Sequence, residues 1–121
     1  MHPMKSFFDA GVVAAYASDY PITYPAYPLI SVYSGVTRQH PGKPDTVHCP
    51  SERATVEQMI QACTLNAARQ FQSEDRYGSI SVGKNADMVL LERDITACDP
   101  EQIHDTPVMR TMVGGEWVYT H

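Results

Sequence analysis

The chain has 121 residues, of which 43% are hydrophobic, and its nine basic and fourteen acidic residues give a formal net charge of -5. This length favours one globular domain and excludes a complete eight-stranded α/β barrel, which needs roughly 200 residues or more. The acidic balance argues against a nucleic-acid partner, and the lack of a roughly 20-residue apolar stretch and of a secretion signal predicts a cytoplasmic protein with no membrane partner.

The first 20 residues predict the end of a helix and then a strand. Residues 4–10 have helical character, with Phe7 and Phe8 packed inward and Gly11 in the left-handed conformation that often ends helices. An apolar run without alternation follows and predicts a strand over about residues 12–18, buried on both faces as in a parallel sheet. Pro21 prevents further pairing beyond it.

Proline recurs throughout residues 21–50 and predicts a long irregular segment. Apolar residues at helical spacing predict one short helix inside it, over residues 28–38, with Pro28 at the first position. Loops of this length in compact domains are uncommon and are often functional.

The clearest helical signal covers residues 55–71. Thr55 and Gln58 match a capping box, in which each side chain bonds to the backbone of the other residue. Thr64 and Asn66 compete for backbone hydrogen bonds, so we expect a break there and a second short helix over residues 65–71.

Strand signals dominate after residue 77. Residues 79–83 alternate, residues 88–91 form a short apolar run, and residues 108–113 join residues 116–119 across two glycines suited to a tight hairpin turn. The sequence therefore predicts an α+β chain in two parts, residues 1–76 with the strand and the helices, and residues 77–121 with a small antiparallel sheet.

Asp19 is the strongest candidate for a catalytic residue. It follows the predicted buried strand, and α/β folds gather ligand-binding and catalytic groups at the carboxyl ends of their strands. A structural alternative is that the Asp19 carboxylate caps the turn beside Pro21 by accepting backbone amides. Position alone leaves both interpretations open.

Other candidate side chains give weaker signals. The histidines include no His-x-His pair. His48 and Cys49 are adjacent, which is poor geometry for binding one zinc ion together, and the alternative interpretation is that both are simply exposed loop residues. Arg38, and less so Lys43, could contact an anionic group of a substrate, although lone loop cations are usually only solvated. Three widely spaced cysteines predict free thiols rather than disulfides.

Five of the seven tyrosines lie within eighteen residues of one another. Such a group could line an amphipathic pocket or an intersubunit face, and core packing is an equal alternative. The five are Tyr16, Tyr20, Tyr24, Tyr27 and Tyr33.

The order of these motifs resembles the carboxyl-terminal part of amidohydrolase-superfamily enzymes, in particular the YtcJ-like, amidohydrolase-3 subgroup. Ser18-Asp19-Tyr20-Pro21 is similar to a Gly-Ser-Asp-x-Pro motif after the last barrel strand, with Ala17 in place of the usual glycine. Residues 36–38 match a Val-Thr-Arg motif. The full resemblance covers five segments in family order: residues 7–21, 28–38, 55–68, 77–91 and 113–119.

This resemblance implies a metal-dependent hydrolase of non-peptide amide or imide C–N bonds. The chain would supply the last strand-helix unit of a TIM (β/α)8 barrel and strands of the small accessory β-sandwich. In the family a divalent metal, commonly zinc, activates a water molecule, and a carboxylate after the last barrel strand takes its proton. Asp19 matches that carboxylate, as a proton shuttle and a metal-site residue. Lys84 and Asp87 match a signature that we interpret as structural.

Several family features have no counterpart here, notably the His-x-His of the first barrel strand and the other metal-ligand histidines. We therefore expect a fragment of a larger enzyme, either a sequence that begins late or a natural truncation. Alone it would bind no metal and be inactive, whereas the parent enzyme would hydrolyse a small amide. The alternative is a non-enzymatic α+β module that self-associates to cover the strand at residues 12–18, and in either case a homo-oligomer is expected.

Overall fold

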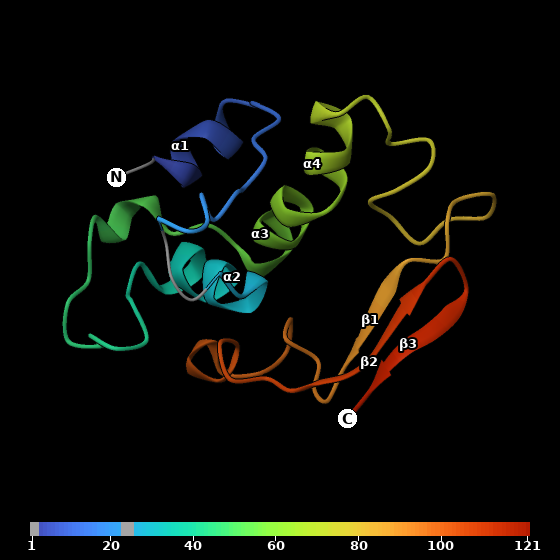
Figure 1. Ribbon diagram of the computed structural model, residues 1–121. Helices are drawn as coiled ribbons and strands as arrows, with labels where there is room; N and C mark the ends of the chain where they lie inside the picture. Colours follow the sequence, from blue (N-terminus) through green and yellow to red (C-terminus); the bar gives the residue numbers. More distant parts are fainter. Residues whose placement is uncertain (1–2, 23–25) are drawn as a thin grey trace.

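A computed structural model describes residues 3–22 and 26–121, and its helices and its sheet lie on opposite sides of the molecule (Figure 1). The long connection after the first strand returns to the helical side and contacts α2 (Figure 1). In chain order, the elements are α1 (Met4–Asp9), α2 (Pro28–Thr37), η1 (Pro50–Glu52), α3 (Val56–Cys63), α4 (Leu65–Gln70), β1 (Met88–Leu91), η2 (Pro100–Gln102), β2 (Val108–Val113) and β3 (Glu116–Thr120).

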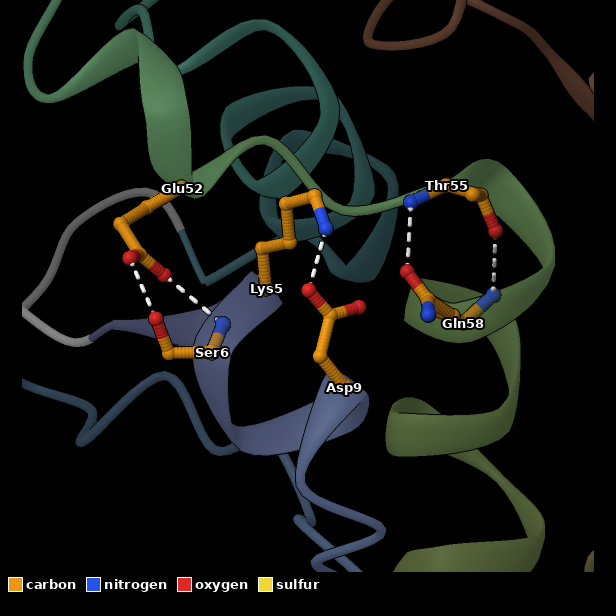
Figure 2. A network of polar contacts seen from close by, with 6 residues as sticks. All are labelled: Lys5, Ser6, Asp9, Glu52, Thr55 and Gln58. Carbon is orange, nitrogen blue, oxygen red and sulfur yellow. Dashed lines mark hydrogen bonds and ion pairs between the residues drawn. The ribbon is translucent and has the colours of Figure 1, made fainter.

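The helix ends follow their local sequence signals. Pro28 occupies the first turn of α2, and Gly11 adopts a left-handed φ of 72° after α1. Thr55 Oγ1 accepts a hydrogen bond from the Gln58 amide at 3.1 Å, and Gln58 Oε1 accepts one from the Thr55 amide at 2.9 Å (Figure 2). Thr64 separates α3 from α4, and its hydroxyl donates to the Ile60 carbonyl at 2.7 Å. These predictions are confirmed.

The core lies between α1, α2, α3 and the connection from β1 to β2. The α2 and α3 helices are so close that a Cβ on Gly35 would come within 2.3 Å of the Met59 sulfur. Phe8 packs against this core, but Phe7 is 40% exposed, so the prediction that both face inward is wrong for Phe7. The buried members are Met4, Val32, Tyr33, Ala54, Met59, Ile95 and Ile103.

The sheet is antiparallel, with strand order β1-β2-β3. Gly114 and Gly115 connect β2 to β3 with φ values of 58° and 88°, which a two-residue hairpin turn requires. The predicted hairpin, the strand at residues 88–91 and the small antiparallel sheet are therefore confirmed.

Residues 79–83 form no strand, so that prediction is wrong. Ile80 is 85% exposed and Val82 is fully exposed. The Lys84 ammonium donates to Ser79 Oγ at 2.7 Å across this turn. Alternation alone does not make a strand, because a strand requires a hydrogen-bonding neighbour, and the described residues place none beside this segment.

Residues 12–18 are irregular and form no strand, which corrects the prediction of a doubly buried one. Val12 and Val13 are 49% and 58% exposed. The segment is held from one side, because the Tyr16 amide donates to the Ala62 carbonyl of α3 at 3.0 Å. The described residues place no parallel strand beside this segment, so some of its apolar side chains stay exposed to solvent.

The described residues thus show short helices and a three-stranded antiparallel sheet, whereas the barrel unit stays a prediction. The division at residues 76 and 77 stays a prediction as well; Ile95 and Ile103 share one core cluster with Val32 and Tyr33. Across residues 3–22 and 26–121, no helix has the length and apolar character needed to cross a membrane.

Candidate functional site

Asp19 lies at the end of the irregular segment, exposed to solvent, with a left-handed φ of 56°. Its backbone carbonyl accepts a hydrogen bond from the Ile22 amide at 2.9 Å, so the main chain closes this turn. Within the described residues, no hydrogen bond involves the Asp19 carboxylate. The predicted capping role for that carboxylate is therefore not seen, and the side chain is presented to solvent.

Asn66 anchors the segment that leads to Asp19. It is 7% exposed, and its side-chain amide donates to the Ala14 carbonyl at 3.0 Å. Together with the bond from the Tyr16 amide to Ala62, this contact attaches the segment to α3 and α4. The sequence analysis treated Asn66 only as part of a helix break, although the family resemblance over residues 55–68, which ends in Thr64-Leu65-Asn66-Ala67-Ala68, was the available signal.

A pocket of about 410 Å³ lies between this segment, α1, α3 and the end of α2. Its apolar wall includes Met4, Phe7, Tyr16 and Met59. Ala17 also lines the pocket, two residues before Asp19, whereas Asp19 itself does not.

The basic and imidazole side chains that line the pocket are those of Arg38, His40 and His48. Arg38 is 9% exposed and ends α2 in a left-handed conformation with φ 63°. Its Nε donates to the His48 carbonyl at 3.1 Å, and the His48 amide donates to the Arg38 carbonyl at 2.9 Å. These two bonds close the loop at residues 38–48, which brings together three side chains that the sequence analysis had not connected. Lys43 is exposed and does not line the pocket.

Glu52 is a carboxylate near enough for the charge of Arg38 to lower its pKa, but its oxygens are hydrogen-bonded to Ser6. Its two oxygens accept bonds from the Ser6 hydroxyl at 2.6 Å and the Ser6 amide at 2.9 Å (Figure 2). These bonds hold the pKa of Glu52 below its usual value, and the charges of Arg38 and Lys5 add smaller contributions. Lys5 itself pairs with Asp9 one helical turn away (Figure 2).

The tyrosines predicted as a group separate in the structure. Tyr33 is fully buried, and its hydroxyl donates to Glu101 at 3.1 Å. Tyr16 lines the pocket, Tyr20 and Tyr27 are largely exposed, and Tyr24 lies outside the described residues.

Metal-ligand chemistry is sparse in the described ranges. No three side chains of His, Cys, Asp or Glu there are close enough to hold a metal ion. Cys49 is exposed while the neighbouring His48 lines the pocket. Burial raises the pKa of the Cys63 thiol to about 11, which keeps it protonated. The residues present do not fit a metal ion on their own.

Lys84 and Asp87 both make local contacts to the chain, although Lys84 does not turn between two strands because residues 79–83 form none. Asp87 directly precedes β1, and its Oδ1 accepts a hydrogen bond from the Gly114 amide at 2.6 Å. This bond links the start of β1 to the turn between β2 and β3. The Lys84 ammonium reaches the Tyr77 carbonyl at 3.4 Å as well as Ser79.

Comparison with known proteins gives one consistent family. Residues 1–119 match the sequence profile of the amidohydrolase family. The chain is 32% identical over 117 residues to the N-substituted formamide deformylase of Arthrobacter pascens, and 31% identical over 116 residues to the putative amidohydrolase YtcJ of Bacillus subtilis strain 168. These alignments cover 95% of this chain but 21% and 22% of the two relatives, so the chain spans about a fifth of their length.

A solved structure shows the same fold. The crystal structure of an amidohydrolase from Thermotoga maritima MSB8 matches 98% of this chain and 26% of its own, with a TM-score of 0.69 and 22% sequence identity. A shorter stretch of 67 residues is 37% identical to the imidazolonepropionase of Bacteroides thetaiotaomicron, covering 55% of this chain and 16% of that protein.

Proposed function

The chain belongs to the amidohydrolase family, and we propose that it is the carboxyl-terminal part of a metal-dependent enzyme that hydrolyses non-peptide C–N bonds in small amides or imides. The observation that carries this proposal is the alignment with relatives over 95% of the chain and only about a fifth of their length. In this proposal, residues 1–76 complete the barrel and residues 77–121 form part of the accessory β-sandwich.

Asp19 is the residue that this chain would contribute to the chemistry. Its exposed carboxylate is available to accept a proton from an attacking nucleophile, which is general-base catalysis. It would join a metal site, commonly a zinc site in such enzymes, only with further ligands from the rest of the polypeptide. Because the described residues do not fit a metal, the role proposed for this chain is limited to this carboxylate and to the adjacent pocket wall.

The anchoring contacts of Asn66 support a positioning role toward Asp19. A catalytic group must be held within a fraction of an ångström of its productive position, and residues that lock the neighbouring backbone provide this. Asn66 bonds to Ala14, five residues before Asp19, from a nearly buried site.

The isolated chain provides the first test. Elemental analysis of the purified chain should find no stoichiometric metal, and N-acyl amino acids and cyclic imides should not be hydrolysed. Stoichiometric zinc together with turnover that is lost in Asp19→Asn would overturn the proposal that the chain alone is incomplete.

A second, non-enzymatic candidate is a self-associating module. The specific observation in its favour is the exposed apolar segment that contains Val12 and Val13. A second copy pairing along residues 12–18 would cover these side chains and satisfy free backbone groups. Light scattering should then show a dimer at micromolar concentration, and a stable monomer would contradict it.

A further inference from the structure

We propose that the pocket beside residues 14–17 binds a small carboxylate with an apolar body, and that the Arg38 guanidinium receives the carboxylate. This inference rests on the proposed function only where it takes the ligand to be a substrate, namely an amide that carries a carboxylate. Binding itself is a property of this chain and is tested without turnover.

Arg38 is nine-tenths buried and uses one of its five N–H donors, the Nε–H that bonds to the His48 carbonyl at 3.1 Å. Within the described residues, the donors on its two terminal nitrogens make no hydrogen bond. Both nitrogens therefore retain some solvent exposure, because the only fully enclosed side-chain atom without a partner in the described residues is His104 Nδ1. Arginine is seldom buried without a partner. Because Arg38 lines the pocket, its free donors are available there to a ligand, and a planar carboxylate matches their fork.

The charge of the pocket favours an anion. Arg38, His40 and His48 line it, and no acidic residue from the described ranges does. This contrasts with the whole chain, in which acidic residues outnumber basic ones by fourteen to nine. No carboxylate lies within ion-pair distance of Arg38 in the described part of the chain, and Glu52 is occupied by Ser6.

The remaining wall selects an apolar body. Met4, Phe7, Ala14, Ala15 and Met59 line it, and the volume of about 410 Å³ suits one ring or a short acyl chain. Inorganic phosphate, which has no apolar part, would leave this wall in contact with water. The ligand is therefore expected to be a small aromatic or acyl carboxylate.

The backbone conformation of Arg38 decides which substitution tests its side chain. A left-handed residue at a helix end is ordinarily glycine or asparagine, because a side chain with a Cβ strains this conformation. Arg38 adopts this conformation with φ 63°, so its backbone alone does not favour an arginine. Arg38→Asn therefore removes the guanidinium while suiting the backbone.

The test is calorimetric titration of the full chain with phenylacetate and with its neutral isostere phenylacetamide. Phenylacetate should bind at least about tenfold more tightly than phenylacetamide, and Arg38→Asn should lose at least about tenfold in phenylacetate affinity. Arg53→Asn is the matched control, because Arg53 Nε also bonds to a backbone carbonyl, that of Thr37 at 3.2 Å, yet does not line the pocket. The phenylacetate affinity of Arg53→Asn should stay within about twofold of that of the native chain.

Any of four results would overturn the inference. Phenylacetamide could bind as tightly as phenylacetate, or inorganic phosphate could compete with phenylacetate. Alternatively, Arg38→Asn could leave the phenylacetate affinity unchanged, or Arg53→Asn could lower it equally. If Arg38→Asn does not fold, amide chemical shifts of residues 14–17 in the native chain decide, because phenylacetate should move them and phenylacetamide should not. An inactive chain that binds phenylacetate supports the inference. A chain that completes an active hydrolase but fails to bind phenylacetate overturns the inference alone.

Discussion

The helical region and the sheet are held together in different ways. Among the described residues, the seven members of the buried hydrophobic core come from the helices, from the link that holds Ala54 before α3 and from the connection after β1, whereas the strands add only the partly buried Leu91 at its edge. Every residue of β3 is exposed. In β1 the consecutive Val89 and Leu90, which lie in regular register and therefore point to opposite faces of the sheet, are each more than half exposed. The helical region is thus stabilised by packing within the chain, whereas the sheet relies on its backbone ladder and has apolar side chains uncovered on both faces.

This difference has a consequence for function. Apolar side chains on both faces of a sheet are typical of sheets that are covered on both sides. We therefore propose that the sheet and the segment at residues 12–18 carry surfaces suited to a partner, while the pocket and Arg38 lie within the helical region, which contains most of the core. The following substitutions probe the two regions, from the largest expected effect on unfolding to the smallest.

Met59→Ala should give the largest loss of stability. Met59 is fully buried, and truncating such a side chain costs about 2–5 kcal/mol. Val118→Ala in β3 is the matched truncation, at a side chain 62% exposed, and should change the free energy of unfolding by about 0.5 kcal/mol or less. Urea denaturation measures both. Equal losses would mean that the sheet is packed as tightly as the helices.

Gly35→Ala should destabilise by about 1–3 kcal/mol, because the new methyl group would overlap Met59 at the contact of α2 with α3. Combined with Met59→Ala, the same change should cost less, since the methyl group then enters space that Met59 has left. Additive losses in a double-mutant cycle would contradict this close packing.

Tyr33→Phe should cost about 0.5–1.5 kcal/mol through the lost hydrogen bond to Glu101. Burial, with the Glu101 hydrogen bond, raises the pKa of Tyr33 above the ordinary tyrosine value of about 10. A raised folded-state pKa gives stability that is complete below the unfolded-state pKa and is lost as pH rises through the folded-state pKa. The difference between native and Tyr33→Phe chains should therefore shrink above about pH 10, and a difference that grows there would contradict the assignment.

Asp87→Ala should have the smallest effect, about 1 kcal/mol or less and confined to the sheet, because it leaves the exposed Gly114 amide without its acceptor. Amide hydrogen exchange should accelerate at the turn between β2 and β3 and stay unchanged in α3. Asp75→Ala, at an exposed loop position, is the control and should alter neither.

Local signals in the sequence predicted most of the helical region and the hairpin. Thr55 and Gln58 form their capping box within one turn, Pro28 starts α2, and two glycines make the turn between β2 and β3. Each signal acts over a few residues, so the sequence contains the whole interaction. The strands predicted at residues 12–18 and 79–83 failed because strand formation depends on neighbours that the described residues do not supply.

The candidate site was predicted only in part, for a related reason. Arg38 was identified as a possible anion contact, but its approach to His48, ten positions along the chain, depends on closure of the loop between them. The contact of Asn66 with Ala14 spans 52 residues, so no short-range pattern specifies it. Asp19 could be singled out because its place after an apolar run is a local feature.

The most direct test of the central proposal replaces the matching segment of the Arthrobacter pascens N-substituted formamide deformylase with this chain. Asp19→Asn in that hybrid should slow hydrolysis of its formamide by about 10²–10⁴-fold, the usual contribution of a general base. Asp9→Asn, at an exposed carboxylate paired with Lys5, is the control and should match the unaltered hybrid. Equal rates for the Asp19→Asn and unaltered hybrids, at equal metal content, would contradict the assignment of Asp19 as the catalytic carboxylate.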